Sequence, residues 1–253
     1  MIAWLAHEQQ PLPPVSQALG AGSEAPGLLA AGGALTPRRL AEAYTRGVFP
    51  WYGEGQPVLW WSPDPRMVLP VAEFALSRSL GKTIRRFIAT PSCEVRIDSA
   101  LEGVLRACAG TPREGQDGTW IVPEMIAAYR AWPAVHSFET WIGGELVGGL
   151  YGVCLGRMFY GESMFSHRSD ASKIALAALV CFCRANGIDL IDCQQRTSHL
   201  ASLGAREIAR SAFERLITPR VRGPALTDWT YHLSHWERLR DTAPALPTEE
   251  VAP

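Results

Sequence analysis

Polar side chains within two apolar segments are the residues of this sequence best suited to do chemistry. The segment 159–165 reads FYGESMF and carries a single acid, Glu162. The segment 190–194 reads LIDCQ and carries Asp192 and Gln194. A buried carboxylate without a partner is costly, and a fully buried strand is normally apolar on both faces. We therefore expect these three side chains to line a cleft, where their oxygens could hold and orient an amine.

Simpler explanations exist for both segments. Glu162 could be a strand-edge carboxylate that points to water, and Asp192 and Gln194 could belong to a buried hydrogen-bond network that fixes a loop. Side chains alternate along an extended strand. This alternation predicts one face with Tyr160, Glu162 and Met164, and an opposite face with Phe159, Ser163 and Phe165.

Aromatic and basic residues form two further groups. The aromatic group consists of Trp51, Trp60, Trp61 and Trp120. We expect at least two of these to be ordinary core residues, and the others could stack on an unpaired base at an RNA end. The segment 77–87, SRSLGKTIRRF, predicts a helix with four cations and no acid on it: Arg78, Lys82, Arg85 and Arg86. Like charges on one face repel, so this cluster indicates a phosphate partner, with a solvated helix face as the alternative.

Composition limits the classes of function. The chain has 253 residues, 47% hydrophobic and 19% charged, with a net charge of −1. This balance gives no global electrostatic attraction to nucleic acid or an anionic membrane, so any RNA contact must use a local patch. No apolar segment reaches the roughly 18–20 residues that span a bilayer. The first residues, MIAWLAHEQQPLPP, do not resemble a signal peptide, and the six cysteines form no CxxC pair. We expect a cytoplasmic protein with reduced cysteines.

The elements that must position these residues follow from local patterns. We expect an α+β protein with a small N-terminal α+β domain and a second domain with a mixed, mainly antiparallel sheet. The predicted helices are 36–47, 77–87, 98–109, 123–132, 170–185, 198–202 and one from 211. The predicted strands are 58–61, 67–69, three successive strands from 136 to 165, 188–194 and 206–209. The predicted boundaries are 1–70 for an irregular segment and the start of the small domain, 71–135 for its remainder, 136–240 for the second domain and 241–253 for a disordered tail.

A meander of three strands followed by helix, strand and helix is typical of GCN5-related N-acetyltransferases, in which two central strands splay to make a cleft. The coenzyme A loop of that class carries glycines before the helix. Here the corresponding loop, SHRSDAS, has none. This argues against the alternative hypothesis, an acyl-CoA-dependent N-acyltransferase.

Several longer stretches carry a specific resemblance. They are GLLAAGGALTPRRL, GVFPWYGEGQPVLWWSPDPRMVL, GTWI, HSFETW, ELVGGLYGV, FYGESMFS, LIDCQ and HLASLGA. Together, over roughly residues 27–218, the chain closely resembles the leucyl/phenylalanyl-tRNA–protein transferase family. Ala34 stands where that family usually has an acid, and Thr36 can still cap the helix that follows.

The resemblance implies an activity. Such enzymes take Leu or Phe, and less well Met, from aminoacyl-tRNA and attach it to an N-terminal Arg or Lys of a protein, which marks that protein for N-end rule degradation. The family fold is a small N-terminal domain followed by an acetyltransferase-like domain. The family uses no cofactor and no metal, and we expect a monomer without membrane contact. A non-catalytic aminoacyl-tRNA binding module is a third hypothesis.

The resemblance also implies roles for individual residues. Gln194 would orient the attacking amine, and Asp192 would polarise Gln194 or relay the proton. Glu162 would bind the cationic N-terminal residue or assist proton transfer, and the sequence leaves this choice open. The implied aminoacyl side-chain pocket consists of Leu150, Phe159, Met164, Leu176, Leu179 and Ile191. Trp51 would stack on the terminal adenine and Trp120 would close the cleft, while Arg78, Lys82, Arg85 and Arg86 would meet acceptor-stem phosphates.

Overall fold

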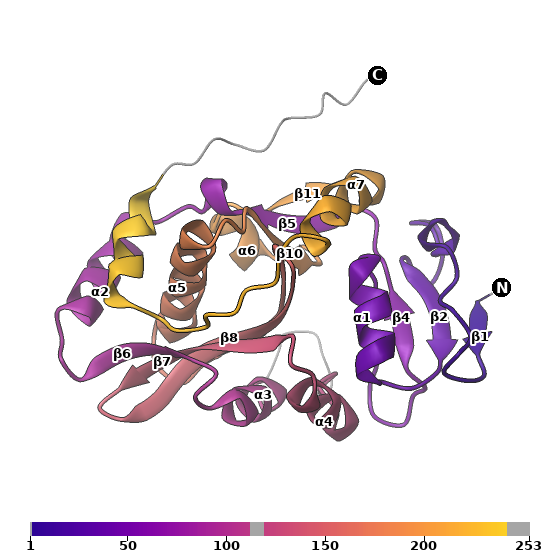
Figure 1. Cartoon of the computed structure of the whole chain (residues 1–253), viewed down its shortest axis with the longest axis horizontal. Helices are drawn as coiled ribbons and strands as arrows, with labels where there is room; N and C mark the ends of the chain where they lie inside the picture. Colours follow the sequence, from indigo (N-terminus) through magenta and orange to yellow (C-terminus); the bar gives the residue numbers. More distant parts are fainter. Residues whose placement is uncertain (1, 112–118, 242–253) are drawn as a thin grey trace, which may run out of the picture.

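Two β-sheets organise the chain. The computed structural model describes residues 2–111 and 119–241. The predicted disordered tail therefore lies almost entirely outside the described residues. Figure 1 shows the smaller sheet with α1 at one end of the molecule and α2 at the other, with α5 between them. The predicted α+β class with a mixed, mainly antiparallel sheet is confirmed. No described helix is both long and apolar enough to cross a membrane.

The smaller sheet has four strands in the order β1-β2-β4-β3. Its elements are β1 (Ala3–Leu5), η1 (Val15–Gln17), β2 (Leu28–Gly32), α1 (Pro37–Thr45), β3 (Phe49–Pro50) and β4 (Leu59–Trp61). Helix α1 begins as predicted, because Thr36 Oγ1 accepts a hydrogen bond from the Arg39 amide and Pro37 takes the first helical position. It ends before Gly47, whose φ of +70° turns the chain into β3.

The larger sheet has seven strands in the order β11-β5-β10-β9-β8-β7-β6. The strands are β5 (Arg66–Pro70), β6 (Cys93–Ile97), β7 (Val135–Ile142), β8 (Glu145–Leu155), β9 (Met158–Ser166), β10 (Leu190–Gln194) and β11 (Arg206–Ile208). The helices around it are η2 (Val71–Glu73), α2 (Arg78–Ile88), α3 (Leu101–Ala109), α4 (Pro123–Ala131), α5 (Ala171–Ala185), α6 (Ser198–Ser202), α7 (Arg210–Val221) and η3 (Leu233–Arg240).

Strands β7, β8 and β9 form the predicted antiparallel meander. The larger sheet contains strands from both sides of residue 136, because β5 pairs with β10 and β6 pairs with β7. Pairing between strands far apart in sequence leaves no local signal, so the sequence could not place these two strands.

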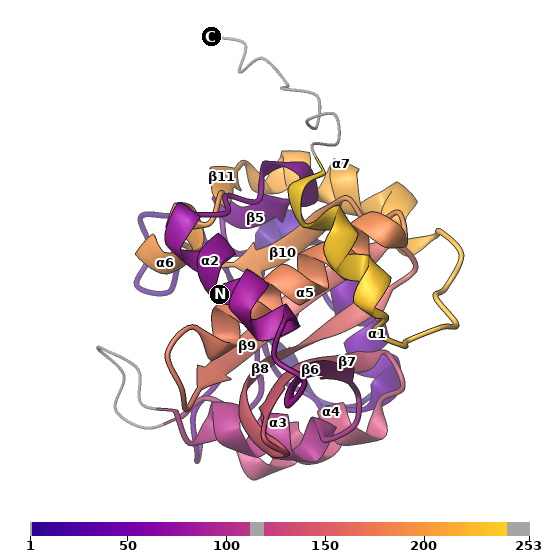
Figure 2. The same ribbon diagram turned by 90° about the vertical axis from the view of Figure 1, so that its left-hand side faces the viewer.

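The two faces of the larger sheet are covered differently. Helix α5 packs on β7, β8 and β9 on one face, and α3 packs on the same strands on the other. At Gly148 the start of α5 approaches the sheet so closely that a Cβ there would lie 2.4 Å from the Ala171 Cβ. Figure 2 shows α5 lying across the strands, with the yellow segment that contains η3 beside it. The position of α5 is thus fixed from both sides.

Strands β9 and β10 separate shortly after they meet. They are parallel, and their register pairs only Ile191 with Phe159 and Asp192 with Tyr160. Beyond these pairs the ladder ends, although both strands continue, to Ser166 and to Gln194. The splayed central strands expected from the meander, helix and strand order are therefore present, and the polar residues of both segments lie where the strands part.

Candidate active site

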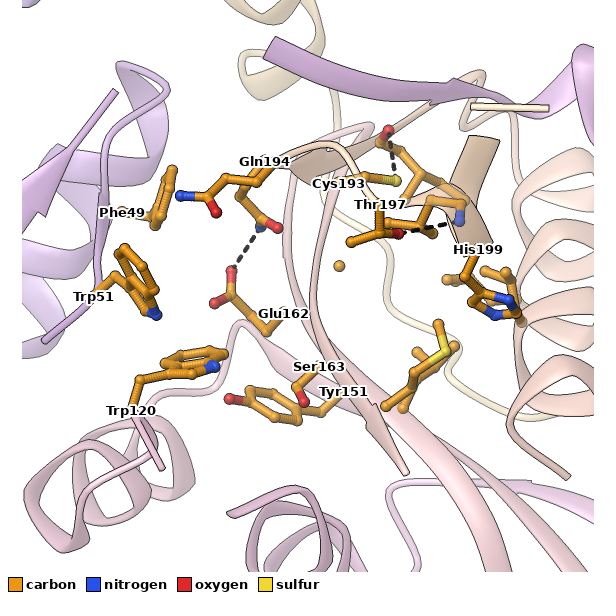
Figure 3. Close-up of a pocket in the computed structure, with 18 residues that line it drawn as sticks. Phe49, Trp51, Trp120, Tyr151, Glu162, Ser163, Cys193, Gln194, Thr197 and His199 are labelled. Carbon is orange, nitrogen blue, oxygen red and sulfur yellow. Dashed lines mark hydrogen bonds between the residues drawn. The ribbon is translucent and has the colours of Figure 1, made fainter. Parts of the chain in front are cut away.

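A cavity of about 370 Å³ lies where β9 and β10 part, and its lining comes from both sheets (Figure 3). Its apolar lining consists of Leu150, Met164, Leu176, Leu179, Ile191 and Leu200. Its polar lining includes Glu162, Ser163, Gln194, Gln195, Thr197 and His199. Its aromatic lining consists of Phe49, Trp51, Trp120 and Tyr151. The cavity is larger than the roughly 150 Å³ that can hold a benzene ring, so a Leu or Phe side chain fits by volume.

Glu162 enters the cavity because β9 contains a bulge. Tyr151 pairs with Ser163, but the next residue of β8, Gly152, pairs with Gly161, which leaves Glu162 without a partner in the ladder. A bulge adds one residue and redirects side chains, and bulges are common beside active sites. Glu162 is thereby turned out of the ladder and toward the cavity.

The same bulge reverses the expected alternation of faces. Phe159 and Met164 belong to the apolar cluster on the α5 face, whereas Tyr160 and Phe165 belong to the cluster on the opposite face. The prediction that Met164 shares a face with Tyr160 and not with Phe159 is therefore wrong. The extra residue shifts the two-residue period by one, and a one-residue shift exchanges the faces.

Two tyrosines hold the Glu162 carboxylate. The Tyr44 hydroxyl donates to Oε1 at 2.7 Å, and the Tyr129 hydroxyl approaches Oε2 at 3.3 Å. The two hydroxyl oxygens lie 2.6 Å apart. Tyr44 comes from α1 and Tyr129 from α4, so three distant segments converge on one carboxylate. Neither tyrosine was singled out from the sequence, since each lies at an ordinary apolar position of its helix.

Burial dominates the ionisation of Glu162. Desolvation raises its pKa from 4.5 to about 8. The negative charge of Asp192 acts in the same direction, while the hydrogen bonds from Tyr44 and Tyr129 oppose it. The charge of Arg66 also opposes it. A carboxyl group with such a pKa exchanges its proton near neutral pH, which suits a general acid or base.

Gln194 faces Glu162 across the gap. Its Nε2 donates to Glu162 Oε1 at 3.3 Å, as Figure 3 shows. The backbone of Gln194 has a φ of +56°, which is uncommon for a residue other than glycine. The pairing of β10 with β5 is irregular at the same point, between Asp192 and Gln194. The polar mouth of the cavity is thus built from a bulge in each of two neighbouring strands.

Asp192 lies behind this mouth and does not line the cavity. It is fully buried and forms two hydrogen bonds with Arg66, from Nε to Oδ1 at 2.8 Å and from Nη2 to Oδ2 at 2.6 Å. The Gln194 backbone amide donates a hydrogen bond to Asp192 Oδ1 at 2.9 Å. We expected Asp192 to polarise the Gln194 side chain, but the hydrogen bond of Asp192 goes to the Gln194 backbone, and the Gln194 side chain donates to Glu162. Arg66 was missed from the sequence, although an arginine that starts an apolar strand was a possible signal.

Trp51 and Trp120 both line the cavity, at the end near Gln194 and Glu162. Trp51 packs edge-on against Trp61, whose indole N–H donates to the Trp51 carbonyl oxygen at 2.6 Å. Trp60 is fully buried in the smaller sheet and donates to the Gly32 carbonyl oxygen. Trp60 and Trp61 are therefore packing residues, which leaves Trp51 and Trp120 as the aromatic surfaces at the cavity.

Five of the six residues implied for the aminoacyl pocket line the cavity together: Leu150, Met164, Leu176, Leu179 and Ile191. Phe159 does not line it. Its ring is fully buried and packs edge-on against Phe138. Leu200 and Cys193 also line the cavity, although no sequence pattern marked them as pocket residues. Leu200 comes from α6, and no periodic pattern in that five-residue helix points to the cavity.

The basic residues of α2 are not at the cavity. Arg78, Lys82, Arg85 and Arg86 are all exposed, and none of them lines it. Figures 1 and 2 place α2 on the side of α5 away from the smaller sheet. A ligand that touches both α2 and the cavity must extend across the surface between them.

Side-chain hydrogen bonds and ion pairs hold the loop before α5. Ser166 Oγ accepts a hydrogen bond from the Ser172 amide at 3.3 Å, near the start of the helix. Arg168 pairs with Glu145 at 2.9 Å, and Lys173 pairs with Asp170 at 2.9 Å. Ser166 thus accepts from one amide of the first turn of α5, whereas the Asp170 side chain makes no capping hydrogen bond. Within residues 2–111 and 119–241, no three His, Cys, Asp or Glu side chains are placed to hold a metal ion.

Comparisons with known proteins identify a family. The model of the leucyl/phenylalanyl-tRNA protein transferase matches residues 68–218, and that of its N-terminal domain matches residues 33–64. A leucyl/phenylalanyl-tRNA–protein transferase of Methylibium petroleiphilum is 69% identical over 248 residues, covering 96% of this chain and 94% of the relative. One from Leptothrix cholodnii is 61% identical over 253 residues, covering 98% and 99%. Among solved structures, that of L-PGS from Bacillus licheniformis aligns with 68% of this chain and 55% of its own, at 11% identity and a TM-score of 0.39.

Proposed function

Because the chain belongs to the leucyl/phenylalanyl-tRNA protein transferase family, we propose that the cavity between β9 and β10 binds the side chain of the transferred amino acid and that its polar mouth receives the acceptor amine. The protein is an aminoacyltransferase. It transfers Leu or Phe, and less well Met, from aminoacyl-tRNA to the α-amine of an N-terminal Arg or Lys. The product is marked for N-end rule degradation, and we place the reaction in the cytoplasm.

The reaction is an ester aminolysis. The α-amine attacks the ester carbonyl carbon, so that a C–N bond forms and the bond from that carbon to the ribose oxygen of the terminal adenosine breaks. The proton leaves the amine and ends on the released ribose hydroxyl. An α-amine has an ordinary pKa of about 7.7–8.0, so a fair fraction is neutral near pH 7. Positioning can therefore supply most of the acceleration.

Gln194 and Glu162 are the groups that would meet the amine. The Gln194 amide nitrogen is engaged with Glu162, which leaves its Oε1 to accept a hydrogen bond from the attacking amine. Glu162, with its pKa raised to about 8, can accept a proton near neutral pH. An arriving cationic residue favours the ionised carboxylate, so substrate binding and proton transfer by Glu162 are coupled. Asp192 would contribute through the backbone of Gln194.

One observation carries the assignment of the donor pocket. Five apolar side chains line the cavity: Leu150, Met164, Leu176, Leu179 and Ile191. An apolar wall distinguishes side chains by only about 1–3 kcal/mol per methylene. Such a pocket fits an enzyme that accepts Leu, Phe and Met. Met164, being flexible, can adapt to both a branched and an aromatic side chain.

The tRNA itself would bind on either side of this pocket. Trp51 presents a partly exposed aromatic surface for the terminal adenine, and Trp120 would close over the ester. Arg78, Lys82, Arg85 and Arg86 would bind acceptor-stem phosphates. Within the described part of the chain no ion pair involves any of these four, which leaves their charges available.

The test compares donors and one variant. Leu-tRNA, but not an acyl-CoA, should label a peptide that begins with Arg, and ribonuclease treatment of the donor should abolish transfer. Gln194→Ala should lower kcat by about 100-fold without changing tRNA affinity. The matched control is Gln17→Ala, an exposed glutamine of η1. Acyl-CoA-dependent labelling that survives ribonuclease would contradict the function, and wild-type transfer by Gln194→Ala would contradict the role of that residue.

A further inference from the structure

Arg66 is a buried cation near the cavity, and each of its three guanidinium nitrogens donates a hydrogen bond. The proposed reaction gives it no part. It opens β5, is fully buried, and does not line the cavity. Nε and Nη2 donate to the two Asp192 oxygens, and Nη1 donates to the Gly47 carbonyl oxygen at 3.0 Å. The guanidinium also lies 4.9 Å from the Phe49 ring centroid and 4.6 Å from that of Phe213.

The contacts of Arg66 reach both sides of the cavity mouth. On one side, Asp192 Oδ1 also accepts the Gln194 amide, which supports the uncommon backbone φ of +56° at Gln194. That backbone geometry directs the Gln194 side chain to Glu162. The pair of Arg66 and Asp192 is therefore part of what aims the amide at the reacting amine.

On the other side, Arg66 fixes the segment that carries the aromatic wall. The Gly47 carbonyl belongs to the turn between α1 and β3, two residues before Phe49 and four before Trp51. Phe49 stacks on the guanidinium and also lines the cavity. One buried side chain thus links the smaller sheet, where the adenine would stack, to the strand that presents Gln194.

Both oxygens of Asp192 are already occupied. Oδ2 accepts from Arg66, and Oδ1 accepts from Arg66 and from the Gln194 amide. A planar guanidinium matches a carboxylate in this two-point fashion, and a lysine ammonium cannot reproduce it. An aspartate held in this way serves as a backbone acceptor and has no direct contact through which to relay a proton to the cavity.

We propose that Arg66 is a positioning residue for aminoacyl transfer, which sets the distance between the aromatic wall and Gln194 and makes Asp192 a structural acceptor for the Gln194 backbone. This inference rests on the proposed function. It assigns no new chemical step, because the amine, the ester and their proton remain with Gln194, Glu162 and the substrate.

The first test compares Arg66→Lys with Arg206→Lys. Arg206 also pairs with a carboxylate, that of Glu73, from the strand next to β5, and it does not line the cavity. Arg66→Lys should lower kcat for Leu transfer by about 100-fold while the protein stays folded at the assay temperature, because a displacement of about 1 Å at the reacting groups costs this much. Arg206→Lys should keep wild-type kcat. A wild-type kcat and KM for Arg66→Lys would overturn the proposal.

A second measurement separates positioning from proton relay. Asp192→Asn keeps an acceptor oxygen for the Gln194 amide but removes the ionisable group. We expect a lower kcat and a pH–rate profile that keeps both limbs, with the limb of Glu162 moved to lower pH, because the charge of Asp192 raises the pKa of Glu162. Loss of one limb of that profile would show that Asp192 transfers protons and would overturn this part of the proposal.

A crystal structure of Arg66→Lys gives a readout that does not depend on activity. The Gln194 side chain should turn away from Glu162, and its retention at the wild-type position would count against the inference. If wild-type protein does not transfer Leu at all, the proposed function fails while this structure still tests the role of Arg66. Should Arg66→Lys not fold, the apolar double variant R66M/D192L should fold and show the same low kcat, because apolar residues often replace a buried ion pair without loss of stability.

Discussion

Gln194 Nε2 and Glu162 Oε1 lie 3.3 Å apart across the gap between β10 and β9, and each reaches that position through an irregularity of its own strand. Glu162 is the extra residue of a bulge, and Gln194 has a left-handed backbone. In regular strands these side chains would follow the alternation of the sheet. The contact therefore depends on two local departures from regular geometry that meet where the parallel pairing ends.

The raised pKa of Glu162 predicts a stability difference that depends on pH. A carboxyl group whose pKa rises from 4.5 to about 8 on folding stabilises the folded state fully below pH 4.5 and loses that contribution as the pH rises toward 8. Glu162→Gln should therefore have a larger free energy of unfolding than wild type at pH 9. We expect a difference on the order of 2 kcal/mol, which is less than the full pKa shift corresponds to, because solvent screens the partly exposed carboxylate. Urea unfolding at pH 4 and pH 9 measures this difference, and an equal difference at both pH values would contradict it.

Tyr44→Phe should raise the pKa of Glu162 further. The Tyr44 hydroxyl donates at 2.7 Å and opposes the effect of desolvation, so its removal favours the protonated carboxyl group. The variant should also lose about 1–3 kcal/mol of stability, because Tyr129 and Glu162 each lose a partner. A carbon-13 NMR titration of the Glu162 carboxyl group measures the shift.

The matched control for that change is Tyr231→Phe. The Tyr231 hydroxyl is buried and has no hydrogen-bond partner among the described residues. Its removal should leave the Glu162 titration where it is in the wild type. A similar shift in both variants would mean that the direct hydrogen bond from Tyr44 is not the cause.

Met164→Phe should change the preference between donors. The larger ring would occupy part of the cavity, which Leu176 and Leu179 also line. We expect kcat/KM for Phe-tRNA to fall by about tenfold more than that for Leu-tRNA, since a mismatch of one methylene or more costs about 1–3 kcal/mol. The ratio of the two donors in one preparation serves as the internal control. An unchanged ratio would remove Met164 from the pocket.

Removing positive charges from α2 should weaken tRNA binding and reduce the dependence of that binding on salt concentration. Arg85→Ala and Arg86→Ala each remove one exposed cation from α2. Each should reduce the slope of log K against log salt by about 1. Arg222→Ala, which removes an exposed arginine after α7, is the control and should keep the wild-type slope. Unchanged affinity of the α2 variants at low salt would place the acceptor stem elsewhere.

Much of the secondary structure could be predicted because its signals are local. Thr36 and Pro37 mark the start of α1, and the paired glycines Gly143 and Gly144, both at positive φ, mark the turn between β7 and β8. The apolar period of α5 predicted its span from 170 to 185, and the structure has Ala171–Ala185. Caps, turns and periods each involve neighbours within a few residues, so the sequence alone specifies them.

The residues that line the cavity were only partly predicted from the sequence. Residue type and family resemblance together selected Leu150, Met164, Leu176, Leu179 and Ile191, which do line one cavity. Phe159 was also predicted but is buried and does not line the cavity. The predicted faces of the β9 side chains were wrong for the residues after Glu162, where the bulge lies. A bulge depends on the partner strand and leaves no mark in the alternation of the strand that contains it.

The sequence by itself determined the family, the helices and the meander, and the presence of acids and an amide in two core strands. The tertiary structure alone decided how they meet. It places Tyr44 and Tyr129 on Glu162, joins Arg66 to Asp192 across 126 residues of chain, and turns Gln194 toward Glu162. These contacts link residues far apart in sequence, and their geometry follows from strand pairing and burial, which no local pattern of side chains records.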